Sequence, residues 1–420
     1  MKARVFRDPV HGLIGLEGPD AIIGGLLDTR ALQRLRRVRQ MGFASLVYPG
    51  AEHSRFGHAL GALHVAGRVC VALGLSEEVA RDVKVAALLH DVGHGPYSHA
   101  WEEALGGGVS HEAWGGRIVA EDDELGAALA AIAPDQAARV VALFEKRYTP
   151  RLARKLVSSQ LDVDRMDYLL RDAHFSGVGY STYDLGWIVH ALRAEKVREG
   201  ADGDDLVVDY RRGMHAVEQY LFGRSYMYAQ VYYHKTVRAA EWLFMLIMRR
   251  FGELAREGRE PAGLATAAAI ARAEKVSVAA YLGLDDARVQ CALADWAAGA
   301  DDAILRDLAA RLTARRLFKT VELPDDPEVP ARLTPRLEAA AARVLGAARA
   351  PYYWAIDRAV SLGYDTRPGE EIFVVGHPRH GTIDLGQLVA ELPLGRKVST
   401  VRLLFAGELD DAFRDVVAAG

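Results

Sequence analysis

Apolar residues recur at helical spacing along most of the chain between residues 20 and 315. The segment 58–74, HALGALHVAGRVCVALG, keeps this spacing and ends at a glycine, as many helices do. The segment 76–93 opens on Ser76, a favourable N-cap residue, and continues as an apolar helix. Further amphipathic helices are predicted over 28–41, 156–173 and 213–251.

The pattern changes from about residue 316, where β-branched runs are broken by proline and glycine. The runs KTVELP, EIFVVGH and KVSTVRLLF predict strands, and two short strands are expected before residue 20, around GLIGLEG. The chain is therefore predicted to be mainly α, with a helical body over 1–315 and a smaller, mixed α+β C-terminal region over 316–420.

Composition excludes several classes of protein. No apolar run approaches the roughly 20 residues that span a bilayer, and the N-terminal segment lacks the apolar stretch of a signal peptide. The two cysteines, Cys70 and Cys291, lie in no paired motif, so we expect a reducing, cytoplasmic setting. Since the net charge is −4, nucleic acid is not an expected partner.

Four residues on three predicted helices form a candidate metal site. His90 and Asp91 end one apolar helix, His58 opens an earlier one, and Asp164 lies on a later one. One helix end cannot supply a full coordination shell, so the other segments must contribute. Two imidazoles with two carboxylates suit Fe, Mn, Ni, Zn or Mg without choosing among them. We therefore predict a bound divalent metal ion.

The ordered pattern H…HD…D resembles the HD superfamily of metal-dependent phosphohydrolases. The motifs DPVHGLIGL, LQRLRRVRQMG, YPGAEHSRFGHALG, LLHDVGHGPYSHAWE and LDVDRMDYLLRDAHFSG resemble more closely its deoxynucleoside triphosphate (dNTP) triphosphohydrolases of the SAM-and-HD-domain type, in the bacterial form without the SAM domain. The resemblance runs from about residue 4 to 240. It implies an HD-domain helical bundle that hydrolyses a dNTP to a deoxynucleoside and triphosphate.

Catalysis of this reaction needs groups that hold phosphate and an acid for the leaving oxygen. His94 and His99 follow the HD pair on a loop from which they can approach a phosphate. His111 is the best candidate general acid, because histidine titrates near neutral pH. The resemblance implies that Glu102 supports it, where the best-known relative has an aspartate, and Glu112 is an alternative. The catalytic candidates are His111, Glu102 and His94.

The resemblance also implies contacts to the substrate. Gln40 would meet the sugar, and Arg55 and Arg165 would bind phosphate. Tyr168 and Asp172, one helical turn apart, would line the sugar pocket, where the Tyr168 ring would crowd a ribose 2′-hydroxyl. The predicted substrate-binding residues are Gln40, Arg55, His94, His99, Arg165, Tyr168, Asp172, Arg224 and Tyr232.

In these relatives a second, allosteric nucleotide binds between subunits, where an Asp, a Gln and an Arg read guanine. This sequence has Asp28, Gln33 and Arg36 at that spacing, with Arg4 and Val5 near the start. The resemblance thus implies a guanine nucleotide activator and a homo-oligomer, either a dimer or a tetramer. An ordinary N-cap aspartate among surface arginines is the alternative interpretation.

Two other functions remain open on the sequence alone. Another HD phosphohydrolase, a nucleotidase or a phosphodiesterase, would use the same metal ligands, although the long match beyond Asp164 argues against a small monophosphatase. A non-catalytic nucleotide sensor would not need an acid at His111, so the presence of that residue favours an enzyme.

Overall fold

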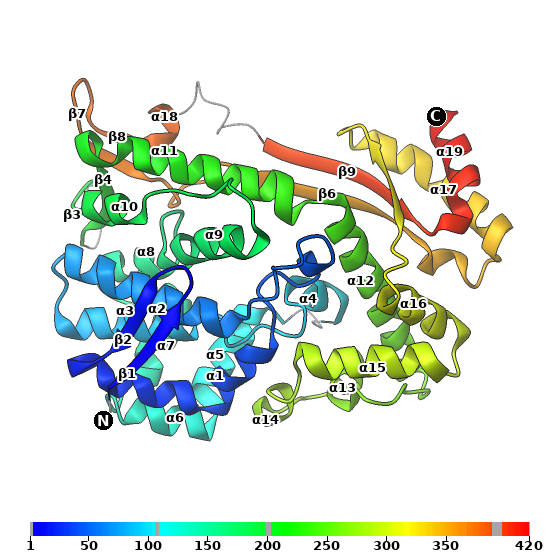
Figure 1. Cartoon of the computed structure of the whole chain (residues 1–420), viewed down its shortest axis with the longest axis horizontal. Coiled ribbons are helices and arrows are strands. Elements are labelled where there is room, and N and C mark those ends of the chain that lie inside the picture. Colours follow the sequence, from blue (N-terminus) through cyan, green and yellow to red (C-terminus); the bar gives the residue numbers. More distant parts are fainter. Residues whose placement is uncertain (1–2, 106–108, 199–202, 366, 389–396, 420) are drawn as a thin grey trace.

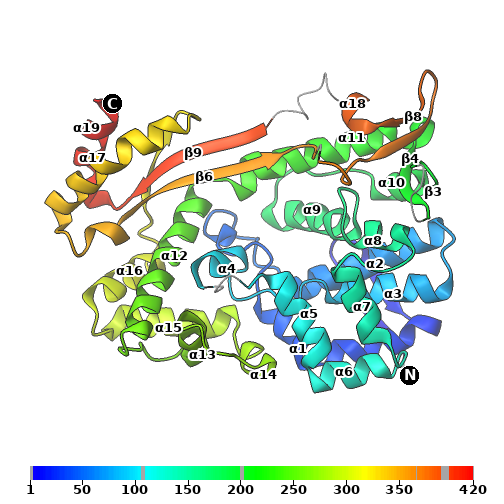
Figure 2. The same cartoon turned by 180° about the vertical axis from the view of Figure 1, so that it is seen from behind.

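A computed structural model describes residues 3–105, 109–198, 203–365, 367–388 and 397–419. Figures 1 and 2 show a helical body and, along one side, a long ribbon of two strands that ends beside the C-terminal helices. This is the predicted class, mainly α with a smaller α+β C-terminal region.

The helices of the body are α1 (Arg30–Arg34), α2 (Arg55–Ala72), α3 (Glu77–Leu89), α4 (His99–Leu105), α5 (His111–Glu121), α6 (Asp123–Ala130), α7 (Gln136–Phe144), α8 (Arg151–Val157), α9 (Val163–Ser176), α10 (Leu185–Ala191), α11 (Tyr210–Met227), α12 (Lys235–Arg256), α13 (Ala265–Ala271), α14 (Val278–Tyr281), α15 (Asp286–Gly299) and α16 (Ala303–Thr313). The C-terminal region adds α17 (Glu328–Leu345), α18 (Leu385–Leu388) and α19 (Asp410–Ala418). The strands are β1 (Arg4–Asp8), β2 (Gly12–Leu16), β3 (Leu192–Glu195), β4 (Asp205–Asp209), β5 (Lys319–Leu323), β6 (Trp354–Leu362), β7 (Phe373–His377), β8 (Gly381–Asp384) and β9 (Lys397–Phe405).

Helices α2 and α3 form where the apolar periodicity predicts them. Gly74, with a φ of +64°, follows α2, and the Ser76 hydroxyl accepts the N–H of Val79 at 3.4 Å to cap α3. Helix α1, in contrast, covers only 5 residues of the helix predicted over 28–41 and then passes into a 3₁₀ turn.

Two other predicted helices are interrupted by side-chain caps. The helix predicted over 156–173 is broken between α8 and α9, because the Asp162 carboxylate accepts the N–H of Arg165 at 2.8 Å and starts a new helix. A π-helical turn follows α11, and α12 begins after His234, whose Nδ1 accepts the N–H of Thr236 at 3.2 Å. Apolar periodicity runs across both breaks and does not reveal them.

The strands in the described part of the chain form three sheets. Strands β1 and β2 pair antiparallel before residue 20, as predicted, and β9 lies between β5 and β6. The third sheet has the order β3-β4-β7-β8, with β4 parallel to β7. The pattern did not predict β3, β4, β6 or β8. Since β3 and β4 belong to the predicted body and β7 and β8 to the predicted C-terminal region, the two regions share this sheet. The domain boundary at 315/316 stays a prediction.

Helices α2 and α9 approach each other closely at Gly61. A Cβ atom there would lie 1.8 Å from Oδ1 of Asp167 and 2.3 Å from Nη2 of Arg171. Asp167 and Arg171 are buried and pair through two hydrogen bonds of 2.8 and 2.9 Å, so neither can move away without leaving a buried charge unpaired. The missing side chain at position 61 therefore makes room for the carboxylate of α9.

We predict that Gly61→Ala destabilises the protein by about 1–3 kcal/mol, because the added methyl group displaces this ion pair. Gly57→Ala, one turn earlier on the same helix, is the control, since its Cβ would lie at an ordinary 3.7 Å from Arg171. It should be neutral or stabilising by up to about 1 kcal/mol. Urea unfolding of both variants measures the difference, and equal effects would contradict the steric explanation.

Candidate metal centre and active site

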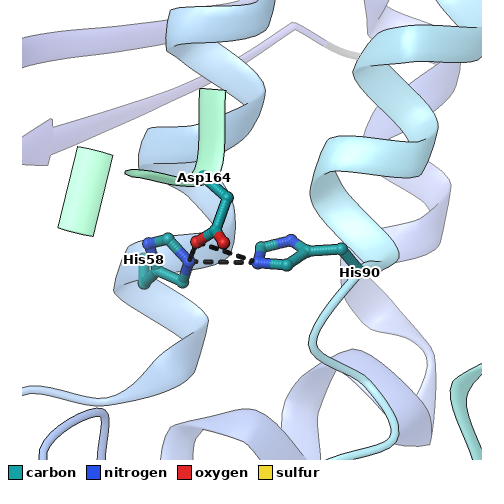
Figure 3. Close-up of side chains that lie close together, drawn as sticks. All are labelled: His58, His90 and Asp164. Carbon is teal, nitrogen blue, oxygen red and sulfur yellow. Dashed lines mark hydrogen bonds and ion pairs between the residues drawn. The ribbon is translucent and has the colours of Figure 1, made fainter. Parts of the chain in front are cut away.

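Three helices each bring one potential metal ligand to a single point (Figure 3). His58 lies in the first turn of α2, His90 follows the last turn of α3, and Asp164 lies in the first turn of α9. Nε2 of His58 is 3.1 Å from Nε2 of His90 and 3.0 Å from Oδ1 of Asp164. Nε2 of His90 is 3.4 Å from the same oxygen. This geometry allows the three groups to hold one metal ion.

Hydrogen bonds behind the two imidazoles determine which nitrogen atom faces the site. Nδ1 of His58 lies 2.7 Å from Oδ2 of Asp167, and Nδ1 of His90 lies 2.7 Å from the carbonyl oxygen of Ala87. Each Nδ1 faces an acceptor and therefore carries a proton. Each Nε2 atom then points into the site, where the two nitrogens can share a metal ion or, without one, a proton. The donor set fits a divalent metal ion.

Asp91, the fourth predicted ligand, lies at the edge of this group. Its Oδ1 is 3.3 Å from Nε2 of His90, and its Oδ2 is 3.7 Å from Nε2 of His58. The guanidinium of Arg55 and Nε2 of His94 also contact the carboxylate, at 2.5 and 3.2 Å. The fold thus brings all four predicted ligands together and ties one of them to a predicted phosphate-binding arginine.

Ion pairing determines the protonation of the metal-free site. Burial alone would lower the pKa of His58, but hydrogen bonds to Asp164 and Asp167 outweigh it and raise this pKa to about 10. Burial also opposes protonation of His90, yet the charges of Asp91 and Asp164 raise its pKa as well. A metal ion must therefore displace protons that the carboxylates hold on the imidazoles.

A cavity of about 540 Å³ opens beside these groups. This volume is within the usual range for sites that bind small molecules of nucleotide size. The predicted residues that line it are Gln40, Arg55, His90, Asp91, His94, His99, His111, Asp164, Arg165, Tyr168, Asp172 and Tyr232. His58 is fully buried, and Glu102 and Arg224 lie outside this lining.

Three histidines and a carboxylate gather at one wall of the cavity. The rings of His94 and His111 stack at 3.9 Å, and Nδ1 of His111 lies 2.8 Å from Oε2 of Glu102. The side chain of His99 is 77% exposed, with its Nδ1 3.9 Å from the same oxygen. The imidazoles of His99 and His111 lower the pKa of Glu102 to about 2, although burial opposes this. Glu102, the predicted partner, is thus ionised and contacts His111.

His94 differs from a cationic phosphate-binding residue. Burial and the nearby Arg55 lower its pKa well below the ordinary value, so the ring is neutral. Its Nε2 donates to Asp91, and its buried Nδ1 has no hydrogen-bond partner among the described residues. The ring can therefore contact a ligand through its surface and through a neutral nitrogen, but it supplies no positive charge.

Another part of the cavity lining contains a hydrogen-bonded carboxylate and two tyrosines. Oδ1 of Asp172 lies 2.8 Å from Nε2 of His53, and the Tyr232 hydroxyl donates to Oδ2 at 2.7 Å. The Tyr168 ring lies 6.4 Å from the Tyr232 ring. Sequence reasoning missed His53, although it stands in the quoted motif YPGAEHSRFGHALG. Its side chain fixes the orientation of a predicted sugar-binding group.

The two arginines predicted on α9 and α11 are in different environments. Arg165 lines the cavity, but its Nη1 already donates to Asp162 at 2.5 Å and to the carbonyl oxygen of Ser159. Arg224 is buried near the Tyr228 ring, and its Nε and Nη1 have no hydrogen-bond partner in the part of the chain that the structure describes. Arg165 is therefore partly neutralised, whereas Arg224 keeps unsatisfied donors.

The residues predicted to bind an activating nucleotide pair with one another at the surface. Nη1 of Arg4 donates to Asp28 at 2.7 Å, and Nε of Arg36 donates to Gln33 at 3.0 Å. Val5 is 55% exposed. Four of the five predicted residues thus form two pairs, Val5 belongs to neither, and the role of all five stays a prediction.

Comparison with known proteins identifies the family. The HD domain matches residues 55–172, and the HD associated region matches residues 197–345. The protein YwfO of Bacillus subtilis is 36% identical over 376 residues, which cover 88% of this chain and 82% of that protein. The chain belongs to the HD family. Residues 55–172, which match the HD domain, contain all four predicted metal ligands, on α2 and α9 and directly after α3.

Two further HD relatives carry functional names. A phosphohydrolase of known structure from Bacteroides thetaiotaomicron is 27% identical, with a TM-score of 0.80, and covers 96% of this chain and 100% of its own. The deoxynucleoside triphosphate triphosphohydrolase SAMHD1 homolog of Dictyostelium discoideum is 33% identical over 195 residues, 42% of this chain and 37% of that protein. Together with the HD domain, these matches support a hydrolase. Within the described ranges, no helix has the length and apolar character needed to cross a membrane.

We predict that metal binding to this HD site releases protons. Between about pH 6.5 and pH 8, below the pKa of about 10 of His58, Mn²⁺ must displace at least one proton, so its affinity should rise about tenfold per pH unit. Calorimetric titration with Mn²⁺ in buffers of different ionisation enthalpy counts the protons released. An affinity independent of pH would contradict this arrangement of protonated imidazoles.

Proposed function

We propose that this chain is a metal-dependent dNTP triphosphohydrolase, which converts a dNTP and water to a deoxynucleoside and triphosphate. One observation carries the proposal: a His/His/Asp group that fits a metal ion opens into the same cavity as Arg55, His111 and the pair of Tyr168 and Asp172. The name of the Dictyostelium relative supports the same substrate class.

A divalent ion held by His58, His90, Asp91 and Asp164 would polarise a phosphoryl oxygen and acidify the attacking water. Arg55 supplies positive charge at the cavity wall while it orients Asp91. Arg165 offers the guanidinium donors that its bonds to Asp162 leave unused. These groups would hold the phosphates beside the metal ligands.

His111 is the proposed donor of the proton that the leaving oxygen needs. Its Nδ1 is held by the ionised Glu102, so Nε2 is the atom that would carry the transferred proton. The stacked, neutral ring of His94 restricts His111 to one orientation without competing for that proton.

The sugar would lie on the side of Tyr168 and Asp172. Asp172 is fixed by His53 and Tyr232, and each of its oxygens retains a lone pair for a sugar hydroxyl. The Tyr168 ring at this wall would leave little room for a 2′-hydroxyl, which favours deoxynucleotides over ribonucleotides.

A guanine nucleotide activator and a homo-oligomer are part of the same proposal. The pairs of Arg4 with Asp28 and of Gln33 with Arg36 present the polar groups that the resemblance assigns to guanine recognition.

The proposal is tested with purified protein, a panel of the four dNTPs and Mn²⁺ or Mg²⁺, with products separated by chromatography. Release of triphosphate and a deoxynucleoside supports it. Orthophosphate from monophosphates would indicate another HD phosphohydrolase, and binding without turnover would indicate a sensor. Repeating the panel with GTP, and measuring the mass by light scattering, tests the activator and the oligomer.

We predict that His111→Ala lowers kcat by about 10²–10⁴-fold, the usual contribution of a general acid, while Mn²⁺ affinity stays unchanged. His90→Ala serves as the contrasting variant, because it should lose the metal ion together with activity. Steady-state kinetics and metal analysis of both proteins separate the two roles. A His111→Ala enzyme as fast as the wild type would remove this residue from the mechanism.

A further inference from the structure

The turn between β1 and β2 lies directly behind the candidate metal centre. The carboxylate of Asp8 accepts the N–H groups of Val10 and His11, both at 2.9 Å, which fixes the turn. Its second oxygen accepts Nη1 of Arg171 at 2.8 Å. The turn is thereby tied to α9, and the His11 side chain, only 3% exposed, points into the interior.

Inside, His11 contacts the carboxylate that orients a metal ligand. Nε2 of His11 lies 2.6 Å from Oδ1 of Asp167, while Oδ2 of Asp167 accepts Nδ1 of His58 at 2.7 Å. Arg171 donates one hydrogen bond to each oxygen. Four donors thus surround Asp167, so both of its oxygens are fully used and the carboxylate cannot rotate.

We propose that His11 is a positioning residue for the metal centre and acts through Asp167. By occupying Oδ1, His11 holds Oδ2 on Nδ1 of His58, which keeps Nε2 of His58 directed at His90 and Asp164. The inference rests on the metal site of the proposed function, and it assigns a role to the DPVHG motif. Hydrogen bonds behind a ligating histidine commonly change metal affinity by 10–100-fold.

A role of His11 in packing alone predicts different effects of substitution from a role as hydrogen-bond donor. The ring of His11 also lies 5.2 Å from the ring of His64, a partly buried residue on α2, the helix that carries His58. If His11 served only to fill space, replacing either histidine would loosen the same region. If it serves as a donor, only changes that remove the hydrogen bond to Asp167 should weaken metal binding.

A pair of amide variants tests the donor role. The amide nitrogen of His11→Gln occupies the position of Nε2 and can reach Asp167, whereas the shorter side chain of His11→Asn cannot. We expect His11→Asn to bind Mn²⁺ about 10–100-fold more weakly than the wild type in a calorimetric titration. His11→Gln should recover most of that loss, and His64→Ala should bind like the wild type. Circular dichroism shows whether each variant is folded.

The other possible results distinguish the positioning role of His11 from the proposed function. Equal Mn²⁺ affinity of His11→Asn and the wild type, or equal losses of affinity in His11→Asn and His64→Ala, would overturn the positioning role. A wild-type protein that binds no Mn²⁺ would overturn the metal site and this inference together. A wild type that binds Mn²⁺ but releases no triphosphate from any dNTP would overturn the proposed activity and leave the role of His11 intact.

Discussion

The buried charge of Asp167 is the constraint on which the centre of this structure depends. A carboxylate in the interior is stable only when donors occupy its oxygens. Here the donors are Arg171 on its own helix, His58 on α2 and His11 in the N-terminal turn. One charge therefore fixes three segments that are far apart in the sequence. Gly61 follows from the same constraint, because a side chain there would take the place of the carboxylate.

This arrangement explains how helices that end near one another can build a metal site. His58 and Asp164 stand in first turns and His90 stands after a last turn, so each side chain leaves its helix where no further turn blocks it. The carbonyl oxygen of Ala87 is a free acceptor at the end of α3, and His90 uses it to direct Nε2 inward. Helix ends supply both the ligands and part of the hydrogen bonding behind them.

The sequence predicted the helical class, the approximate positions of α2 and α3 and the convergence of His58, His90, Asp91 and Asp164, since periodicity and an ordered motif carry that information. It missed the break before α9, because the cap at Asp162 leaves the apolar periodicity unchanged. It also missed β3 and β4, which pair with each other, and the pairing of β4 with β7 is a tertiary contact between residues more than 160 positions apart. The roles of Asp167 and His11 depend on contacts across α2 and α9, which no local pattern encodes.

The cavity is lined by two chemically different sets of groups, and both bear on the choice of substrate. Around the metal ligands lie Arg55 and His111, which a phosphate group alone could use. In the second set, the buried carboxylate of Asp172 is held by His53 and Tyr232, and a carboxylate is not a group that binds phosphate. Burying a carboxylate costs free energy unless it is fully hydrogen-bonded. The position of Asp172 beside Tyr168 therefore calls for a ligand with polar groups that reach this carboxylate. A nucleoside triphosphate has phosphates for the first set of groups and sugar hydroxyls for the second, whereas a phosphate monoester of a small alcohol has only the phosphate.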